Sequence, residues 1–360
     1  MTKYPRVTRA MSRIPWAILP DKLADIEDFL VRVNTTGPLT EAAVQEQYGT
    51  KEARPRIRVG SVEVIPVQGV ISQKINMMDN ISGPGGTSTE LLSQEIQRAI
   101  DDKQISAILL DIDSPGGSVF GVQELSDVIM QARDKKRITA IASPYAASAA
   151  YWIAAAANEL VVAPSGQVGS IGVFLMHQDV SKAMEAEGVQ TSYVKAGKYK
   201  TEGNPYEPLS DDARAALQDQ VNAYYDMFVK GVARGRGVSQ AAVKGGFGEG
   251  RMVMAADAVK AGMADRVATF DATLGKMLMR GARQAGDKTA IATVRDFEAF
   301  LRDEGSLSNK EAKRIASLAF EGRETLRDGA DEPAARLQTE DVEDAEGRAI
   351  LRKFIDSTTR

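Results

Sequence analysis

An alternation of apolar runs with helical segments, beginning at residue 61, constrains the fold of this chain most strongly. The clearest run, residues 106–112 (SAILLDI), is almost wholly apolar, which is typical of a strand covered on both faces of a sheet. Segments with helical spacing follow such runs repeatedly. Because alternating strands and helices favour parallel pairing through helical crossovers, the sequence predicts an α/β protein with a central parallel sheet.

The individual elements are predicted from the same periodicity. Strands are expected at residues 62–71, 106–112, 138–142, 159–162, 170–174 and 190–194, and helices at 88–99, 119–132, 149–156, 180–187 and 211–234. Residues 251–267 fit a strand, a helix and a short strand. Outside this region, helical spacing predicts helices at 20–33, 40–45, 293–302 and 308–320.

Three regions are expected along the chain. Residues 1–60 form an N-terminal extension with helical segments, ending in a connector at 55–58. Residues 61–280 form the main domain. Residues 281–360 form a polar, partly helical tail, with a linker at 281–287 (GARQAGD) and an acidic stretch at 329–347.

The absence of cysteine and the presence of a single histidine, His177, restrict the chemistry available to the chain. No thiol nucleophile, disulfide or thiolate-bound zinc is possible, and one histidine cannot form a multi-histidine metal site. Within one chain, His177 is the only residue that could serve as base in a Ser-His-Asp triad. Any nucleophilic chemistry is therefore expected to use a different base.

Charge and hydropathy exclude two classes of partner. The formal net charge is −4 and 26% of residues are charged, which gives no basic field for nucleic acid. The longest apolar stretch, residues 138–157, is rich in alanine and interrupted by Ser143-Pro144-Tyr145, so it predicts a buried strand, turn and helix rather than a membrane span. The first residues lack the apolar core of a secretory signal, and we expect a cytosolic protein with no membrane partner.

Two segments follow predicted strands directly and each has two interpretations. Residues 113–118 (DSPGGS) could expose backbone N–H groups as an oxyanion hole, or form an ordinary tight turn before a helix. In residues 145–152 (YAASAAYW), alanines surround Ser148 at a strand-to-helix turn, which leaves room for a polypeptide backbone to approach its hydroxyl. Ser148 is accordingly either a nucleophile or a helix N-cap.

Two further segments carry candidate polar groups. Residues 167–173 (QVGSIGV) fit a glycine-flanked strand, although Ser170 could instead hydrogen-bond a catalytic amine. Residues 195–205 (KAGKYKTEGNP) contain three lysines, which usually form a solvated surface. A lysine acts as a general base only where burial or nearby positive charge lowers its pKa from about 10.4 towards neutrality.

Taken in order and spacing, these four segments resemble the motifs of the signal-peptide-peptidase A family of serine–lysine peptidases, over about residues 62–270. The fold of that family lies in one superfamily with the Clp protease subunit and the crotonases, so the resemblance implies a ClpP/crotonase-like fold of repeated β-β-α units in a spiral. The segments SRIPWAILPDKL, GGTSTELL, GNPYEPLS and TVRDFEAFLRDEG are similar to the phage and prophage members, which are capsid-assembly or prohead proteases.

The resemblance also implies roles for particular residues. Ser148 matches the nucleophile, Lys200 the general base and Ser170 the residue that holds the lysine. Gly117 and the backbone N–H of Ala149 match the oxyanion donors.

Three positions near these residues need separate comment. Many relatives have Ser-Gly-Gly where this chain has Ser148-Ala149-Ala150, but a backbone N–H donor is retained by alanine. Lys198 is the rival to Lys200, and the glycine–x–aromatic–lysine order of the family favours Lys200. No family motif assigns a task to His177, which is expected to be structural.

Overall, the resemblance implies a serine endopeptidase that works through an acyl-enzyme on a polypeptide substrate, without cofactor or metal. It implies a ring or dome-shaped homo-oligomer in which serine and lysine come from adjacent protomers, with phage capsid, scaffold or portal proteins as partners. The expected location is the host cytoplasm or the interior of the prohead. Apolar residues on helix 211–234, such as Leu217 and Val221, would pack against a neighbouring protomer or simply against the core.

Three alternatives stay open at this point. The protein could be a general cytosolic peptidase that degrades peptides or signal-peptide remnants. It could be a capsid scaffold or assembly protein with a secondary or no proteolytic role, its tail contacting the shell. A crotonase acting on acyl-thioesters is the third, but the sequence shows no support for coenzyme A and this function leaves Ser148 and Lys200 without a role.

Overall fold

A computed structural model of the chain describes residues 14–36, 56–74, 86–284, 293–303 and 307–320. The predictions for residues 40–45 and 329–347, and for the last part of the expected linker, 285–287, lie outside these ranges. The chain divides into two units, Met1–Ala319 and Phe320–Arg360.

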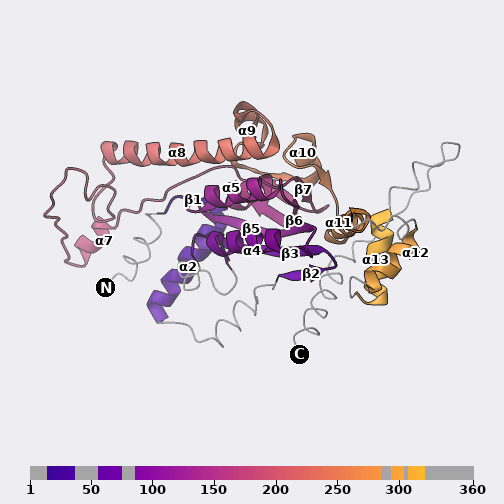
Figure 1. Cartoon of the computed structure of the whole chain (residues 1–360). Helices are drawn as coiled ribbons and strands as arrows, with labels where there is room; N and C mark the ends of the chain where they lie inside the picture. Colours follow the sequence, from indigo (N-terminus) through magenta and orange to yellow (C-terminus); the bar gives the residue numbers. More distant parts are fainter. Residues whose placement is uncertain (1–13, 37–55, 75–85, 285–292, 304–306, 321–360) are drawn as a thin grey trace, which may run out of the picture. The chain divides into compact units, whose positions relative to one another are not determined.

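A mainly parallel sheet forms the centre of the first unit (Figure 1). Its strands follow the spatial order β10-β7-β6-β5-β3-β2, and every neighbouring pair is parallel except β2 with β3. Their bounds are β2 Ile57–Val59, β3 Val62–Ser72, β5 Ala107–Ser118, β6 Arg137–Ala147, β7 Glu159–Val162 and β10 Arg266–Val267. The predicted α/β class with a central parallel sheet is confirmed.

The sheet opens where β5 and β6 end. The last pair between these strands is Ser114 with Ala146, beyond which each strand takes a different neighbour. The end of β5 pairs with β1 (Trp16–Ile18) in antiparallel orientation, whereas the end of β6 pairs with β8 (Gln167–Gly169). Two further short strands, β4 (Thr87–Ser88) and β9 (Met252–Met254), pair with β3 and β8.

Helices cover the sheet largely as the periodicity predicts. In Figure 1, α4 and α5 lie side by side and α8 extends over α5. Helix α8 also packs against α6. The side chain of Ser88 caps α4, and Gly237 ends α8 in the left-handed conformation. The bounds are α2 Pro20–Thr36, α4 Thr89–Asp101, α5 Val122–Ala132, α6 Ala149–Ala155, α7 Ser181–Ala186, α8 Asp211–Arg236, α9 Gln240–Gly246, α10 Ala255–Lys260, α11 Phe270–Gln284, α12 Val294–Asp303 and α13 Asn309–Phe320.

The core is densest around α6, all of whose side chains are buried. Trp152 stacks on Phe228 of α8, with ring centroids 4.9 Å apart and planes at 9°. Gly231 permits this approach, because a Cβ at that position would lie only 2.1 Å from the indole Nε1 of Trp152. The C-terminal half of α8 is thereby fixed against the helix that begins at Ser148.

Several predicted elements differ from the structure. Residues 170–174 form no strand apart from an isolated bridge at Phe174, and residues 190–194 form none because no strand lies beside them. The connector predicted at 55–58 contributes to edge strand β2, and residues 281–284 of the predicted linker continue α11. Local composition suggested these assignments, but strand and helix bounds depend on tertiary neighbours.

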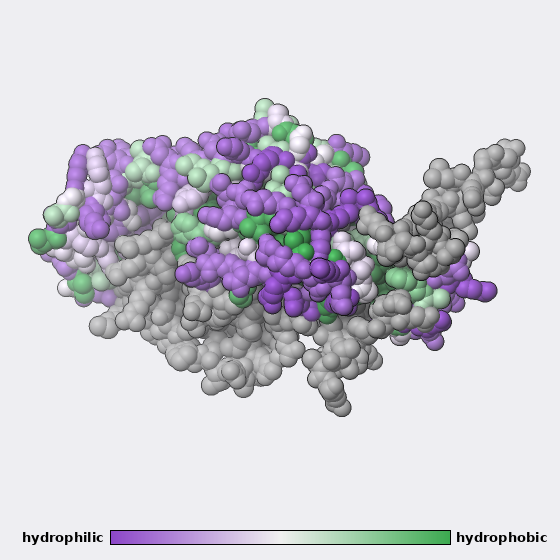
Figure 2. Space-filling model, in the orientation of Figure 1, coloured by the Kyte–Doolittle hydropathy of each residue, from purple (hydrophilic) through white to green (hydrophobic). Residues whose placement is uncertain are grey.

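The polar region after α11 contains the two predicted helices, α12 and α13. Arg314 of α13 forms an ion pair with Asp271 of α11, at 3.2 Å. Figure 2 shows mainly hydrophilic residues on the face over α4, α5 and α8. Within the described residues, every helix is too short or too polar to cross a membrane.

Candidate active site

Ser148 lies at the sharp turn between β6 and α6. Its backbone angles, φ 54° and ψ −118°, are those that favour glycine, and holding a serine there costs about 1–3 kcal/mol. The turn is fixed from both sides: the Ser148 N–H donates to Gly169 at 2.7 Å, and the Ser148 carbonyl accepts from Trp152 at 3.1 Å. The arrangement places the serine on a strand-to-helix elbow, a geometry that the nucleophile of α/β-hydrolases also adopts.

Ser148 is only 1% exposed, and its buried hydroxyl has no hydrogen-bond partner within the described residues. Ser148 does occupy the N-cap position of α6, as one of its two interpretations expects, but its side chain makes no capping hydrogen bond. Leaving a buried hydroxyl unpaired costs about 1–3 kcal/mol. Ser126 and Thr139 are also unpaired, but they lie in a regular helix and strand, whereas Ser148 combines the unpaired hydroxyl with a strained backbone.

The structure brings Ala149 and Ser170 to the same place as Ser148. Ala149 is the first residue of α6, where a backbone N–H has no intrahelical acceptor. Ser170 follows Gly169, which accepts the Ser148 N–H, and its own N–H donates to Arg251 at 2.9 Å. Like Ser148, Ser170 has a positive φ, 53°, so two strained serines lie next to each other across the β6–β8 pair.

The first glycine of the DSPGGS segment also lies beside Ser148, in a strand rather than a turn. The segment continues β5 as far as Ser118, and α5 starts only at Val122, so the predicted tight turn is wrong. Gly116 approaches Ser148 closely, because a Cβ there would lie 3.0 Å from the Cβ of Ser148. Gly117 is the next residue and is paired with Ala17 of β1.

Lys200 lies in an exposed segment, residues 188–203, which we call the arm. In Figure 1 the arm and α7 lie at the end of α8 farthest from α9. Lys195 bonds Thr201 within the arm, and Lys198 lies 4.7 Å from the ring centre of Tyr199. The ammonium of Lys200 has no partner within the described part of the chain, and it does not contact the Ser148 hydroxyl. A single chain therefore assembles the other predicted site residues but not the lysine.

The base of the arm is fixed by main-chain contacts. His177 Nε2 lies 3.1 Å from the carbonyl oxygen of Asn204, and the Val180 N–H donates to Pro205 at 2.8 Å. His177 thus holds the point at which the arm returns to the body of the protein.

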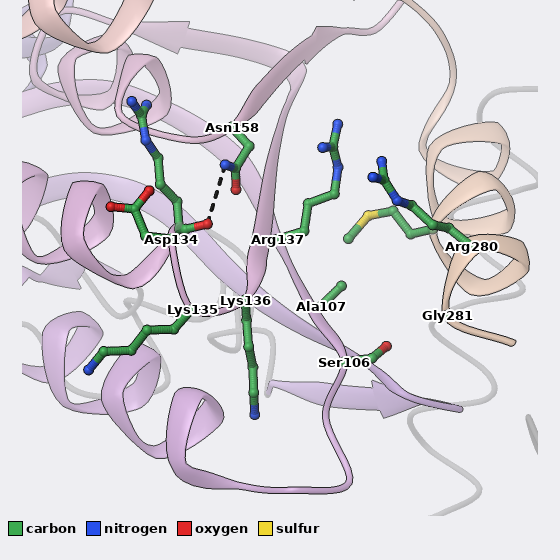
Figure 3. Close-up of a pocket in the computed structure, with 11 residues that line it drawn as sticks. Ser106, Ala107, Asp134, Lys135, Lys136, Arg137, Asn158, Arg280 and Gly281 are labelled. Atoms are coloured by element: carbon green, nitrogen blue, oxygen red, sulfur yellow. Dashed lines mark hydrogen bonds between the residues drawn. The ribbon is translucent and has the colours of Figure 1, made fainter. Parts of the chain in front are cut away.

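A cavity of about 280 Å³ lies at the opposite end of the strands from Ser148, near the amino ends of β5 and β6 (Figure 3). Three of its basic residues are engaged: Arg133 donates to Ala156, Arg137 pairs with Glu159, and Lys136 donates to two backbone carbonyls. Burial lowers the pKa of Lys136. This cavity is remote along the strands from Ser148 and takes no part in the candidate site.

Strand β1 and Gly169 are parts of this site that the sequence does not indicate. Gly169 lies inside the QVGSIGV segment, but nothing in its spacing shows that its carbonyl accepts the Ser148 N–H. The three residues of β1 are too few for a periodic signal.

The chain is similar in sequence to several curated proteins. The chain is 32% identical over 246 residues to "Capsid assembly protease C" of Escherichia phage lambda, covering 68% of this chain and 55% of the relative. It is 30% identical over 292 residues to "Head-tail preconnector protein GP5" of Enterobacteria phage P21, covering 80% of this chain and 58% of the relative. It is also 26% identical over 253 residues to "Protease 4" of Haemophilus influenzae, covering 68% and 38%.

The chain thus spans less than two thirds of the length of each of these relatives. Among solved structures, a ClpP1 mutant from Listeria monocytogenes is similar with a TM-score of 0.35 and 14% identity, covering 57% of this chain and 90% of that one. Residues 130–283, which include Ser148, Ser170 and Lys200, match the model of peptidase family S49, and the resemblance to the signal-peptide-peptidase A type of peptidase is confirmed.

Proposed function

We propose that the protein is a serine endopeptidase in which Ser148 is the nucleophile and Lys200 the general base. The observation that carries the proposal is the hydroxyl of Ser148, buried and unpaired on a strained elbow. An unpaired hydroxyl can donate its proton to a base that comes from another chain. Backbone strain such as that at Ser148 concentrates at active sites.

In the proposed reaction, the neutral amine of Lys200 takes the proton of Ser148 while the serine oxygen attacks the scissile carbonyl. Backbone N–H groups of Gly117 and Ala149 bind the oxyanion, each worth about 10²–10³ in rate. The protonated lysine then donates to the leaving amine, and water hydrolyses the acyl-enzyme. Ser170 would hold the lysine. Because only the neutral amine accepts a proton, the rate should rise with pH.

The exposed position of Lys200 supports a site shared between protomers. Large apolar side chains of the arm are exposed as well, among them Tyr193 at 44% and Val194 at 105%. Burying this exposed apolar surface of the arm against another copy of the chain is more favourable than leaving it in water. We therefore propose a homo-oligomer in which the arm of one protomer carries Lys200 to Ser148 of the next.

The natural substrates are proposed to be capsid or scaffold proteins during prohead maturation. The names of the lambda and P21 relatives support this context. A general peptidase acting on loose polypeptides is the second candidate, since "Protease 4" of Haemophilus influenzae also matches.

The test incubates the purified protein with capsid and scaffold proteins and, separately, with unfolded casein. Specific clipping of a capsid or scaffold protein, absent in Ser148→Ala, supports maturation, whereas cleavage of casein alone supports the general peptidase. Processing retained by both Ser148→Ala and Lys200→Ala would contradict the dyad. Co-assembly without any cleavage would favour a scaffold.

A further inference from the structure

Strand β1 fills the gap in the sheet beside Ser148. On one edge it pairs with the end of β5, Ala17 lying opposite Gly117. On the other edge, Trp16 and Phe174 exchange two backbone hydrogen bonds, of 2.9 and 3.0 Å. The three residues of β1 therefore have main-chain neighbours on both sides, at the point where β5 and β6 have separated.

The carbonyl group of Ala17 lies close to the nucleophile. A Cβ built on Gly116 would be 2.2 Å from the Ala17 oxygen and 3.0 Å from the Ser148 Cβ, so both groups approach the same glycine. Backbone bonds from Leu19 to Pro115 and from Val119 to Pro15 flank the Ala17–Gly117 pair. In an antiparallel ladder every second pair of opposite residues is hydrogen-bonded, so the Ala17–Gly117 pair, which lies between these two, exchanges backbone hydrogen bonds as well. The predicted oxyanion donor Gly117 is therefore occupied by β1.

Both β1 and Ser148 are buried. Trp16, Ala17 and Ile18 are 1%, 0% and 2% exposed, and Ser148, which approaches the same glycine as Ala17, is 1% exposed. A substrate cannot reach a hydroxyl that is covered to this extent. Some segment must move before catalysis. Strand β1 is a candidate because it has only three residues and pairs with the end of β5 and with a single residue, Phe174, on its other side.

Proteins commonly bind an extended polypeptide by adding it as a strand to an open sheet edge. We propose that β1 is a resident strand in the substrate groove, and that a polypeptide substrate takes its place between β5 and Phe174. This inference rests on the proposed peptidase function and adds to it the path of the substrate and a built-in block.

The resident strand also indicates which polypeptides fit the groove. Ala17 faces the main core, whereas Trp16 and Ile18 on either side pack into a separate apolar cluster with Leu23 and Ile26 of α2. The groove thus accommodates a small residue opposite Gly117, flanked by large apolar residues. Segments of the pattern apolar–small–apolar are the predicted substrate class.

A disulfide can lock β1 in place, and the natural absence of cysteine makes the cross-link unambiguous. Pro15 accepts the backbone hydrogen bond of Val119, and Cα atoms of such a pair lie about 5.5 Å apart, within reach of a disulfide. The oxidised double variant Pro15→Cys/Val119→Cys should hydrolyse polypeptides at least about tenfold more slowly than its reduced form. Each single variant should keep its rate on oxidation.

Full activity of the cross-linked protein, or failure of the cross-link to form in a folded double variant, would overturn the proposal that β1 occupies the substrate groove and leaves it when substrate binds. Loss of hydrolysis by the wild-type protein itself would instead contradict the proposed peptidase function.

Hydrogen–deuterium exchange gives a second measurement that needs neither cysteine nor catalysis. In full-length Ser148→Ala, a synthetic peptide with the sequence of residues 12–19 should bind and accelerate exchange of the Trp16 and Leu19 amides, because it displaces β1. A matched peptide with tryptophan in place of the alanine should not. Binding that leaves these amides protected, or no binding of the first peptide, would overturn the inference.

Discussion

The surroundings of Ser148 and the arm that carries Lys200 contrast in almost every physical property. The residues around Ser148, namely 116–117, 147–149 and 169–170, are called the wall. The wall is buried, its strained serines are fixed by backbone hydrogen bonds, and its main chain belongs to the sheet. The arm is exposed over most of its length and is fixed mainly at its base. The comparison teaches that the proposed nucleophile and its environment are built by one chain, whereas the proposed base, Lys200, is exposed, where a second surface can receive it.

Helix α8 joins the two regions, and its two halves differ as the regions do: its C-terminal half is more buried and its N-terminal half is more exposed. Its C-terminal half is anchored by the buried residues Phe228 and Val229, and by Arg236, which bonds both carboxylate oxygens of Asp265 at 2.8 Å. Leu217 and Val221, nearer the arm, are only half-buried. Of the two sequence interpretations for this helix, core packing therefore holds for its C-terminal half, and the other half is available for a neighbour.

The largest expected effect falls on the wall. Ser148→Ala should lower cleavage by about 10⁴-fold, since it removes the nucleophile. The free energy of unfolding should stay the same or rise by about 1 kcal/mol, because a buried unpaired hydroxyl disappears. Peptide cleavage and urea unfolding measure the two effects. Ser126→Ala is the matched control, which removes another buried unpaired hydroxyl and should keep activity. A protein with Ser148→Ala that still cleaves would break the account of the wall.

The next effect falls on the arm. Lys200→Ala should reduce cleavage by about 10³-fold through loss of the general base. Its unfolding free energy should change by no more than about 0.5 kcal/mol, because the residue is exposed. Lys198→Ala, which alters the neighbouring exposed lysine, should cleave at nearly the normal rate. The reverse ranking of the two lysines would assign the base to Lys198.

The anchor of α8 should show in stability rather than chemistry. Burial by itself raises the pKa of Asp265, but hydrogen bonds from Arg236 and from the Leu160 N–H outweigh it and hold the pKa below its ordinary value. The pair therefore stabilises the fold above the unfolded-state pKa of about 3.9 and loses its effect as pH falls through the folded-state value.

Accordingly, Arg236→Ala should lower the unfolding free energy at pH 7 by about 2 kcal/mol, with a smaller difference in acid. Urea unfolding at both pH values measures this. Lys260→Ala, which removes one partner of an exposed ion pair with Asp257, serves as control and should change little. An equal loss at both pH values would contradict the charge-based account of the anchor.

The smallest effect is expected at the base of the arm. His177→Ala removes the contact with Asn204 and should lower the unfolding free energy by no more than about 1 kcal/mol, with cleavage largely retained. Steady-state cleavage assays compare it directly with Lys200→Ala. A loss as large as that of Lys200→Ala would give the only histidine a role in the chemistry.

The sequence predicted those parts of the fold that have local signals. The buried run in β5, the glycine after α8 and the alanine-rich stretch of α6 each carry a periodic or terminating pattern, and these elements are present. The motifs also indicated Ser148, Ala149 and Ser170, which the fold brings together. Local sequence gave no sign of the positive φ angles of the two serines, because tertiary hydrogen bonds impose them.

The failures lie where long-range neighbours decide the outcome. Residues 190–194 contain β-prone side chains, but a strand needs an adjacent edge and the arm offers none. Strand β1 is the opposite case, since three residues without periodicity become a strand because the ends of β5 and the segment at Phe174 flank them.

Subunit mixing tests the central claim most directly, namely that the wall of one protomer and the arm of another form one site. Ser148→Ala and Lys200→Ala proteins, each inactive alone, are unfolded together, refolded in equal amounts and assayed for cleavage. A site shared between protomers predicts recovery of about a quarter of wild-type activity, because that fraction of sites combines an intact Ser148 with an intact Lys200. Mixed oligomers that stay inactive, while wild-type protein refolded in the same way is active, would contradict the shared site.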